Sequence, residues 1–145
     1  MGIGFPKVKH LKIKPTKKKA WVACSRYIRL RDAIKTTGTK EMVMCYTCPA
    51  VVPIQGRGCA QAGHFIGGRK NVLLFDENQI RAQCYMCNIR RKGNWDAYYR
   101  NMVEEFGFEV VQNMIYAKWD TIKYTPQEFL DIEATFISKL QKLSV

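Results

Sequence analysis

The chain has 145 residues, of which 47% are apolar and 12% aromatic, so its composition excludes intrinsic disorder and its length suits one domain. Its 24 Lys and Arg residues outnumber 12 Asp and Glu residues, and residues 1–40 carry +11 of the formal +12 charge. Residues 41–92 carry +4 and residues 93–145 carry −3, so the basic excess belongs to the N-terminal part. Such a basic arm predicts a polyanionic partner, because cations placed on phosphates release condensed counterions; a solubilising tail is the alternative.

The N-terminus and the cysteines indicate the compartment. Residues 1–19 are too charged for a signal peptide, and no apolar stretch approaches the roughly 20 residues that cross a bilayer. We therefore expect a cytoplasmic protein with reduced thiols and no membrane partner. In that setting, six cysteines that include two CxxC pairs indicate a metal site more than a set of disulfides.

The expected elements make a single α+β domain. It has four parts in chain order: an extended basic arm (1–19), a basic helix (20–38), a zinc-bound core (41–93) and C-terminal helices (94–145). Thr16 could cap the first helix, and Gly38 ends it. The apolar positions of this helix include Cys24 and Ile28, and they alternate with basic positions.

Short strands are expected near the CxxC pairs. Residues 41–52 have a β-like pattern and contain the first pair. Residues 63–66 and 71–75 could form a second pair of strands around Gly67-Gly68. The second CxxC then opens a short helical segment that ends near Gly93.

Three helices are expected in the C-terminal part. Asn94 can cap the first, and Gly107 ends it. The apolar pattern of the second helix places five residues inward: Val110, Val111, Met114, Ile115 and Trp119. The last helix begins after Thr125-Pro126, a favourable pair for the cap and the first helical position. These helices could pack on the core or form the face of a dimer.

The two CxxC pairs predict a structural zinc site. They are separated by 35 residues, and each pair can supply two thiolates from one tight turn. Two such turns complete the tetrahedral shell that structural zinc prefers. The four ligands would be Cys45, Cys48, Cys84 and Cys87. The alternative is two pairs of buried or disulfide-linked cysteines.

One histidine lies between the two CxxC pairs. It is His64 in the segment Gln61-Ala-Gly-His-Phe65, and Asn88 directly follows the second pair. A single His is commonly structural, and the other histidine, His10, belongs to the basic arm. The zinc turns at both ends of this segment would, however, bring His64 close to Asn88.

Several short motifs occur together over about residues 45–106. They are Cys45-x-x-Cys48, Ala62-Gly-His-Phe65, Phe75-Asp-Glu77, Gln83-Cys-x-x-Cys-Asn88, Gly93-Asn94 and Tyr98. Their arrangement resembles the HNH or ββα-metal nucleases built on a treble-clef zinc finger. It is most similar to the NinG/Rap family of lambdoid phages, recombination nucleases that act on branched DNA. Endonuclease VII of T-even phage, a Holliday-junction resolvase, is a more distant likeness.

The resemblance implies a fold, an activity and a partner. The fold would be α+β, with a zinc-stabilised treble-clef, HNH-like core. The activity would be endonucleolytic hydrolysis of branched or Holliday-junction DNA in phage recombination, in the cytoplasm of the host. His64 would be the general base, and Asn88 would bind a catalytic Mg²⁺ or Mn²⁺. A homodimer is one arrangement that would suit symmetric cleavage of a junction.

Two positions depart from the pattern of these nucleases. HNH enzymes commonly place an Asp or His before the base, where this chain has Gly63, a residue that the NinG-type pattern shares. Asp76 and Glu77 are therefore candidate ligands of the catalytic metal. The family's middle Asn, which orients the loop of the base by hydrogen bonding, falls on Gln79; a shift of one residue would give that role to Asn78.

Clustered cations beside these motifs suit phosphate contacts, although an ordinary solvated surface is the alternative for each one. Nothing in the sequence resembles an element that reads bases, so we expect recognition of DNA shape. The candidate DNA contacts are Lys17, Lys18, Lys19, Arg26, Arg69, Lys70, Arg90, Arg91 and Lys92.

Three functions compete on this sequence. The first is a metal-dependent endodeoxyribonuclease, favoured by His64 and Asn88. The second is a non-catalytic zinc-containing DNA-binding or adaptor protein with a decayed HNH site, favoured by Gly63 and Gln79. The third is a ribosomal-type RNA binder, which explains the basic arm but gives no reason for the segment around His64.

Overall fold

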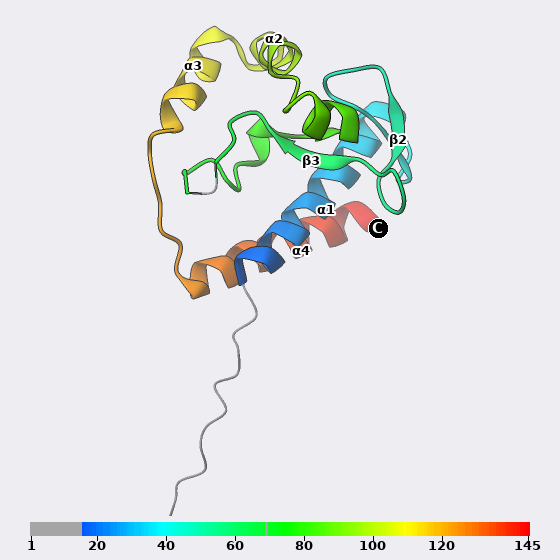
Figure 1. Cartoon of the computed structure of the whole chain (residues 1–145). Helices are drawn as coiled ribbons and strands as arrows, with labels where there is room; N and C mark the ends of the chain where they lie inside the picture. The colour runs from blue at the N-terminus through cyan, green and yellow to red at the C-terminus, as the bar shows by residue number, and fades with distance from the viewer. Residues whose placement is uncertain (1–15, 69) are drawn as a thin grey trace, which may run out of the picture.

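A computed structural model describes residues 16–68 and 70–145, so the expectations for residues 1–15 and for Arg69 lie outside the described residues. The described chain is a mixed α+β structure, as the sequence predicted, and Figure 1 shows its elements in order. The helices are α1 (Thr16–Thr37), α2 (Trp95–Phe106), α3 (Phe108–Ala117) and α4 (Pro126–Ser144). The strands are β1 (Met42–Met44), β2 (Val51–Pro53), β3 (Gln61–His64) and β4 (Ile80–Gln83). A 3₁₀ turn, η1 (Glu77–Gln79), precedes β4, and a π-helical turn, η2 (Met86–Arg90), follows it.

The strands form two antiparallel pairs. β1 pairs with β2 around the first CxxC, as the β-like pattern of residues 41–52 predicted. The second pair corrects the sequence expectation, because β3 pairs with β4 and not with residues 71–75, which form turns. In this register His64 lies opposite Ile80.

Strand β4 is not among the elements expected from the sequence, and its full burial is unusual for its composition. Residues 80–83 (Ile-Arg-Ala-Gln) alternate between apolar and polar, a pattern typical of a strand with one solvent-exposed face. All four residues are nevertheless buried. Arg81 pairs with Glu105 of α2 at 2.8 Å, and the Gln83 amide donates to Thr47 and to the backbone of Gly93. Polar partners on neighbouring segments therefore allow β4 to lie inside the molecule.

Helix α1 packs lengthwise against α4 (Figure 1). It also contacts the strands β1, β3 and β4. Cys24 and Ile28 are fully buried in this layer, together with Ile80 and Phe136, so the predicted apolar face of the first helix is confirmed. Burial raises the pKa of the Cys24 thiol to about 12, which makes this cysteine an inert core residue. Gly38 directly follows the helix, as expected, with a left-handed φ of 69°.

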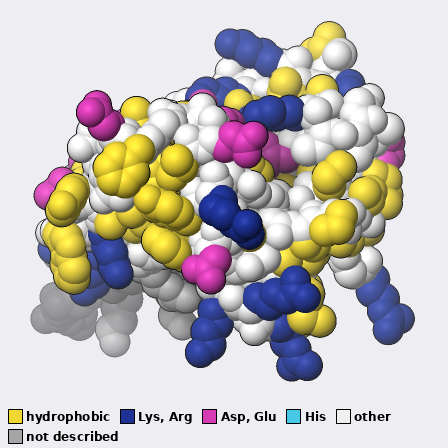
Figure 2. All heavy atoms as spheres, turned by 90° about the horizontal axis from the view of Figure 1, so that it is seen from above, with side chains coloured by type: hydrophobic (Ala, Val, Ile, Leu, Met, Phe, Trp, Pro, Cys, Tyr) yellow, Lys and Arg dark blue, Asp and Glu magenta, His cyan; other side chains and the backbone are white. Residues whose placement is uncertain are grey.

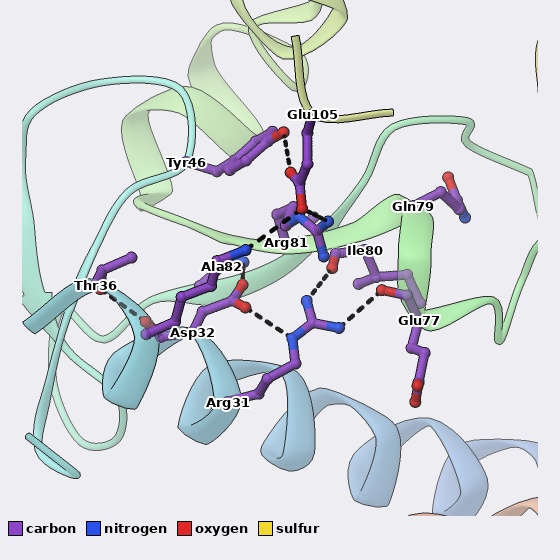
Figure 3. A network of polar contacts seen from close by, with 12 residues as sticks. Arg31, Asp32, Thr36, Tyr46, Glu77, Gln79, Ile80, Arg81, Ala82 and Glu105 are labelled. Carbon is purple, nitrogen blue, oxygen red and sulfur yellow. Dashed lines mark hydrogen bonds and ion pairs between the residues drawn. The ribbon is translucent and has the colours of Figure 1, made fainter. Parts of the chain in front are cut away.

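A polar network fixes α1 on β4 (Figure 3). Buried Asp32 accepts a 2.7 Å hydrogen bond from the backbone N–H of Ala82 and pairs with Arg31. The other two Arg31 nitrogens donate to the carbonyls of Glu77 and Ile80. This role of Arg31 could not be predicted, because the carbonyls that it satisfies lie more than 40 residues away in the sequence.

The C-terminal helices follow most of the expectations. α2 begins after Asn94 and ends before Gly107, and α4 begins at Pro126, with the Thr125 hydroxyl accepting from the N–H of Glu128. Within α3, Val111 and Met114 are buried, as predicted, whereas the inward position predicted for Val110 is wrong, because this residue is 43% exposed. Figure 2 shows hydrophobic side chains gathered over α3. The exposed members of this region are Phe108, Val110, Tyr116 and Trp119.

The inward position expected for Trp119 is wrong, because this residue is 76% exposed. Helix α3 ends at Ala117, so Trp119 has left the helical register on which the prediction relied. The chain then turns to run beside the loop after β3, where Val72 N–H donates to Asp120 O and Ile122 N–H donates to Lys70 O. Within residues 16–68 and 70–145, none of the helices has the length and apolar character needed to span a membrane.

Candidate metal centre and the His64 cleft

The four predicted zinc cysteines come together in the structure. The Sγ atoms of Cys45, Cys48, Cys84 and Cys87 all lie within 4.8 Å of one another. The Cys48 and Cys84 sulfurs are 3.7 Å apart. This agrees with the separation of about 3.8 Å between the sulfurs of a tetrahedral site with Zn–S bonds of about 2.3 Å. Four convergent thiol sulfurs at this spacing fit a metal ion such as zinc.

Two separate segments supply these sulfurs. Cys45 and Cys48 belong to the turn between β1 and β2, whereas Cys84 directly follows β4 and Cys87 lies in η2. Asn94 lies in the left-handed region with φ 48°, and its side-chain amide donates to the Cys87 sulfur and to the carbonyl of Thr47. Asn94 therefore precedes α2 as expected, but its side chain supports the cysteine cluster and does not cap the helix.

The cluster shifts its own thiols in opposite directions. Burial, together with hydrogen bonds among the cysteines, raises the pKa of Cys48 to about 12 and raises that of Cys84 as well. Burial acts in the same direction on Cys87, yet hydrogen bonds from Thr47, Cys48 and Asn94 outweigh it and lower the pKa of Cys87 to about 7. These hydrogen bonds therefore favour the thiolate of Cys87, the form of a cysteine that binds a metal ion.

His64 ends β3 and is held by contacts on two sides. Its Nε2 lies 2.9 Å from the carbonyl of Leu74, and its ring stacks on Trp21 of α1 with centroids 4.7 Å apart. Because a carbonyl can only accept, Nε2 carries the proton and the lone pair of the neutral ring is on Nδ1. Burial lowers the pKa of His64 below its ordinary value, and the hydrogen bond to Leu74 only partly opposes this effect.

His64 and Asn88 line the same cleft, whose volume is about 430 Å³. The Asn88 amide nitrogen donates to Gln61 Oε1 of β3 at 2.7 Å, and Asn88 Oδ1 lies 3.0 Å from the position that a Cβ of Gly63 would occupy. The proximity expected from the positions of the two zinc turns is thus present in the structure. The cleft is also lined by Ala62, Phe65, Ile66, Gly67, Lys92, Gly93, Trp95 and Lys118.

The glycine at position 63 has a steric cause. A Cβ on Gly63 would lie 1.9 Å from Gln83 Oε1 and 3.0 Å from Asn88 Oδ1, so no side chain fits at this point while Gln83 keeps its position. Gly63 has no left-handed φ, so close approach and not backbone conformation requires the glycine.

Of the two candidates for the middle position, the structure places Gln79 and not Asn78 against the loop after His64. Gln79 is fully buried, its Oε1 accepts from Ile66 N–H, and its Nε2 donates to Leu73 O, both at 2.7 Å. Leu73 precedes the residue whose carbonyl binds His64. Asn78 is exposed, and its backbone N–H donates to the side chain of Asp76.

Asp76 and Glu77 lie away from the cleft. Asp76 caps η1, and Glu77 forms a 2.7 Å ion pair with Lys139 of α4. Both line a different pocket, against α4, together with Asp131. Among the described residues, the four cysteines are the one group of three or more Cys, His, Asp or Glu side chains close enough to share a metal ion. The structure therefore does not bring Asp76 and Glu77 to Asn88.

The candidate DNA contacts fall into separate places. Lys92 lines the His64 cleft, and Lys17 and Lys18 line a second pocket, of about 630 Å³, on the other side of His64. Lys19 and Arg26 line a groove against α4. The remaining described candidates are exposed: Lys70, Arg90 and Arg91.

Sequence reasoning did not single out Lys118, although it lines the cleft beside Lys92. It is 30 residues from Asn88 along the chain, and it reaches the cleft only because the segment after α3 returns to the loop that follows β3. The sequence does not single out Gln83 as a site residue either, because it stands there only as the residue before Cys84.

Comparison with known proteins gives the family of this chain. The family described as Bacteriophage Lambda NinG protein matches residues 6–145. The chain belongs to the NinG family. The NinG proteins of Escherichia phage 933W and Salmonella phage P22 are each 28% identical to it over 141 residues, or 94% of this chain. The NinG protein of Escherichia phage lambda has the same identity and coverage. This NinG chain spans 63–64% of the length of these relatives. No solved structure matches it.

Proposed function

We propose that this NinG family chain is a metal-dependent endodeoxyribonuclease with an HNH-like, treble-clef core. The observation that carries the proposal is the single cleft lined by both His64 and Asn88. A neutral imidazole with its lone pair on Nδ1 and an amide oxygen from a second residue of the same cleft are the groups that such a hydrolysis needs.

His64 supplies the base in this proposal. Phosphodiester hydrolysis requires a water molecule that loses its proton as it attacks phosphorus, and His64 Nδ1 can accept that proton. The carbonyl of Leu74 and the ring of Trp21 fix the orientation of the imidazole. General-base catalysis of this kind contributes typically about 100- to 10,000-fold to the rate.

Asn88 offers an amide oxygen to a divalent cation. A bound Mg²⁺ or Mn²⁺ would stabilise the charge that develops on the phosphate and on the leaving oxygen. Gln61 holds the Asn88 amide so that its oxygen, and not its nitrogen, is available. A single amide ligand binds Mg²⁺ weakly, so we expect DNA phosphate and water to complete the coordination.

Lysines on both sides of His64 favour a phosphate backbone as the ligand. Lys92 and Lys118 line the cleft, and Lys17 and Lys18 line the neighbouring pocket. These cations suit contacts to phosphates, which position the DNA without reading its sequence. Selectivity for branched or junction DNA rests on the family resemblance alone.

Cleavage assays with purified zinc-loaded protein test the proposal. The substrates are a four-way junction, a flap and a plain duplex, each with Mg²⁺, with Mn²⁺ and with neither ion. We expect metal-dependent cutting of the branched substrates that His64→Ala abolishes. The matched control is His10→Ala, which changes the other histidine and should cut as the wild type does.

Two results would overturn the assignment. If the wild type cuts none of these substrates with either metal but still binds them, the chain is a non-catalytic DNA-binding or adaptor protein. If His64→Ala cuts as fast as the wild type, His64 is not the base.

A further inference from the structure

Gln83 is a buried glutamine whose amide nitrogen makes hydrogen bonds and whose amide oxygen makes none. Its side chain is 0% exposed, and its Nε2 donates to Thr47 Oγ1 at 2.9 Å and to Gly93 O at 2.8 Å. These two bonds fix which end of the amide is nitrogen, because a carbonyl such as Gly93 O accepts only from N–H. Gln83 Oε1 is buried and has no hydrogen-bond partner. An unpaired buried oxygen of this kind costs roughly 1–3 kcal/mol, so a ligand that satisfies it is expected.

A second amide oxygen converges on the same point. Gln83 Oε1 and Asn88 Oδ1 lie 1.9 and 3.0 Å from the position that a Cβ of residue 63 would occupy. The Gln83 oxygen therefore fills the space from which a side chain at residue 63 would extend toward Asn88. HNH enzymes commonly place an Asp or His metal ligand at that position, which is Gly63 in this chain.

We propose that Gln83 Oε1 is a ligand of the divalent metal that binds at Asn88, in place of an acidic side chain at residue 63. The inference rests on the proposed nuclease function for its choice of metal. Amide oxygens are ordinary ligands of hard divalent cations. Two amide oxygens carry no net charge, so this pair binds the cation more weakly than a carboxylate does, and occupancy depends on DNA phosphates.

Direct metal binding tests this pair without any need for DNA cleavage. The probes are Mn²⁺, followed by electron paramagnetic resonance, and Tb³⁺, whose luminescence the tryptophans sensitise; Trp95 lines the cleft. Both are hard cations that prefer oxygen ligands, so they do not displace zinc from the soft cysteine thiolates. We expect Gln83→Met, which keeps the length of the side chain and removes its oxygen, to weaken binding of both ions about ten-fold or more.

The matched control is the double variant Asp76→Asn/Glu77→Gln, which neutralises the rival ligands that the sequence suggested. It should bind both ions as the wild type does, because these side chains lie in the pocket against α4. Unchanged binding of both ions by Gln83→Met would overturn the inference, and so would a control that binds them as weakly as Gln83→Met does. Zinc content, measured on every variant, shows that the fold is intact.

A side-chain exchange tests the same geometry if Gln83→Met fails to fold. Gly63→Asp alone should disrupt the site, because its Cβ meets Gln83 Oε1. Gly63→Asp/Gln83→Ala should fold and bind Mn²⁺ at least as tightly as the wild type, since a carboxylate then replaces the amide. A folded Gly63→Asp single variant, or a double variant that binds no Mn²⁺, would contradict the proposal.

The inference and the proposed function can fail separately. If the wild type cuts DNA and Gln83→Met binds Mn²⁺ and Tb³⁺ unchanged, the Gln83 ligand is overturned and the nuclease stands. If Gln83→Met loses both ions but the wild type cuts no substrate, the ligand pair stands without the nuclease.

Discussion

The surroundings of His64 select one protonation state of its imidazole ring. The Leu74 carbonyl fixes the tautomer, Trp21 covers one face of the ring, and burial disfavours the cation. A histidine with a lowered pKa is neutral at pH 7, which is the state that a general base requires. None of this could be deduced from the sequence, because Trp21 and Leu74 are 43 and 10 residues away and neither carries a motif.

This environment predicts the pH dependence of cleavage. The rate should rise with pH through the pKa of His64, which lies below the ordinary histidine value, and level off once the imidazole is neutral, because only the neutral ring accepts a proton. Trp21→Ala should expose the ring, raise the pKa of His64 toward its ordinary value and move the acidic limb to higher pH. NMR titration of the ring protons, in a His10→Gln background that leaves a single histidine, measures the same pKa. An acidic limb that stays in place in Trp21→Ala would show that the stacking has no such effect.

At the scale of elements, α1 determines the position of the base. This helix carries Trp21 against His64 at its start, and one turn from its end it carries Asp32 against the backbone of β4. The Asp32 side chain is 8% exposed and holds both Ala82 N–H and the Arg31 guanidinium. Docking of α1 on β4 therefore holds in place the surface against which His64 packs.

We expect Asp32→Ala to destabilise the protein by about 3–5 kcal/mol, since it leaves Arg31 and the Ala82 N–H without their buried partner. Urea unfolding followed by circular dichroism measures this change. Asp120→Ala is the matched control, because Asp120 is exposed, and it should cost no more than about 0.5 kcal/mol. Equal effects of the two substitutions would mean that the network of Figure 3 adds little to stability.

The elements also show where sequence reasoning succeeds and where it stops. Apolar periodicity and residues that mark helix ends predict α1, α2 and α4. These markers are local in the sequence: Gly38 follows α1, Gly107 follows α2, and Thr125-Pro126 begins α4. They failed for β4, whose buried Arg81 and Gln83 are satisfied only by residues distant in the sequence. The cysteine cluster was predictable because its spacing is local, whereas the Gln83 oxygen beside Gly63 depends on strand register.

At the scale of the whole molecule, the cysteine cluster joins the two halves of the core. It connects the β1–β2 turn to the end of β4 and to η2, which begins two residues before Asn88. The position of Asn88 opposite His64 thus depends on this junction. A bound zinc ion would contribute its binding free energy to folding, because the site is absent from the unfolded chain.

We therefore expect metal removal to unfold the core. Cys84→Ser should lose zinc by elemental analysis and lose its cooperative thermal transition, and a strong chelator should do the same to the wild type. Cys24→Ser is the matched control, because Cys24 is buried outside the cluster and should retain stoichiometric zinc. Full zinc content in Cys84→Ser would exclude a four-cysteine site.

The distribution of charge around the cleft predicts how DNA binding responds to salt. Lys92 and Lys118 line the cleft, whereas Lys19 and Arg26 line a groove against α4, so equal charge changes at the two places should act differently. Each phosphate contact adds about 0.9 to the slope of log K against log salt concentration. Lys92→Gln/Lys118→Gln should therefore lower that slope by about 2, measured by fluorescence anisotropy on a four-way junction. Lys19→Gln/Arg26→Gln removes the same charge and should leave the slope close to that of the wild type. If both double variants lower the slope equally, DNA responds to the net charge of the molecule, and the cleft is not where the phosphates bind.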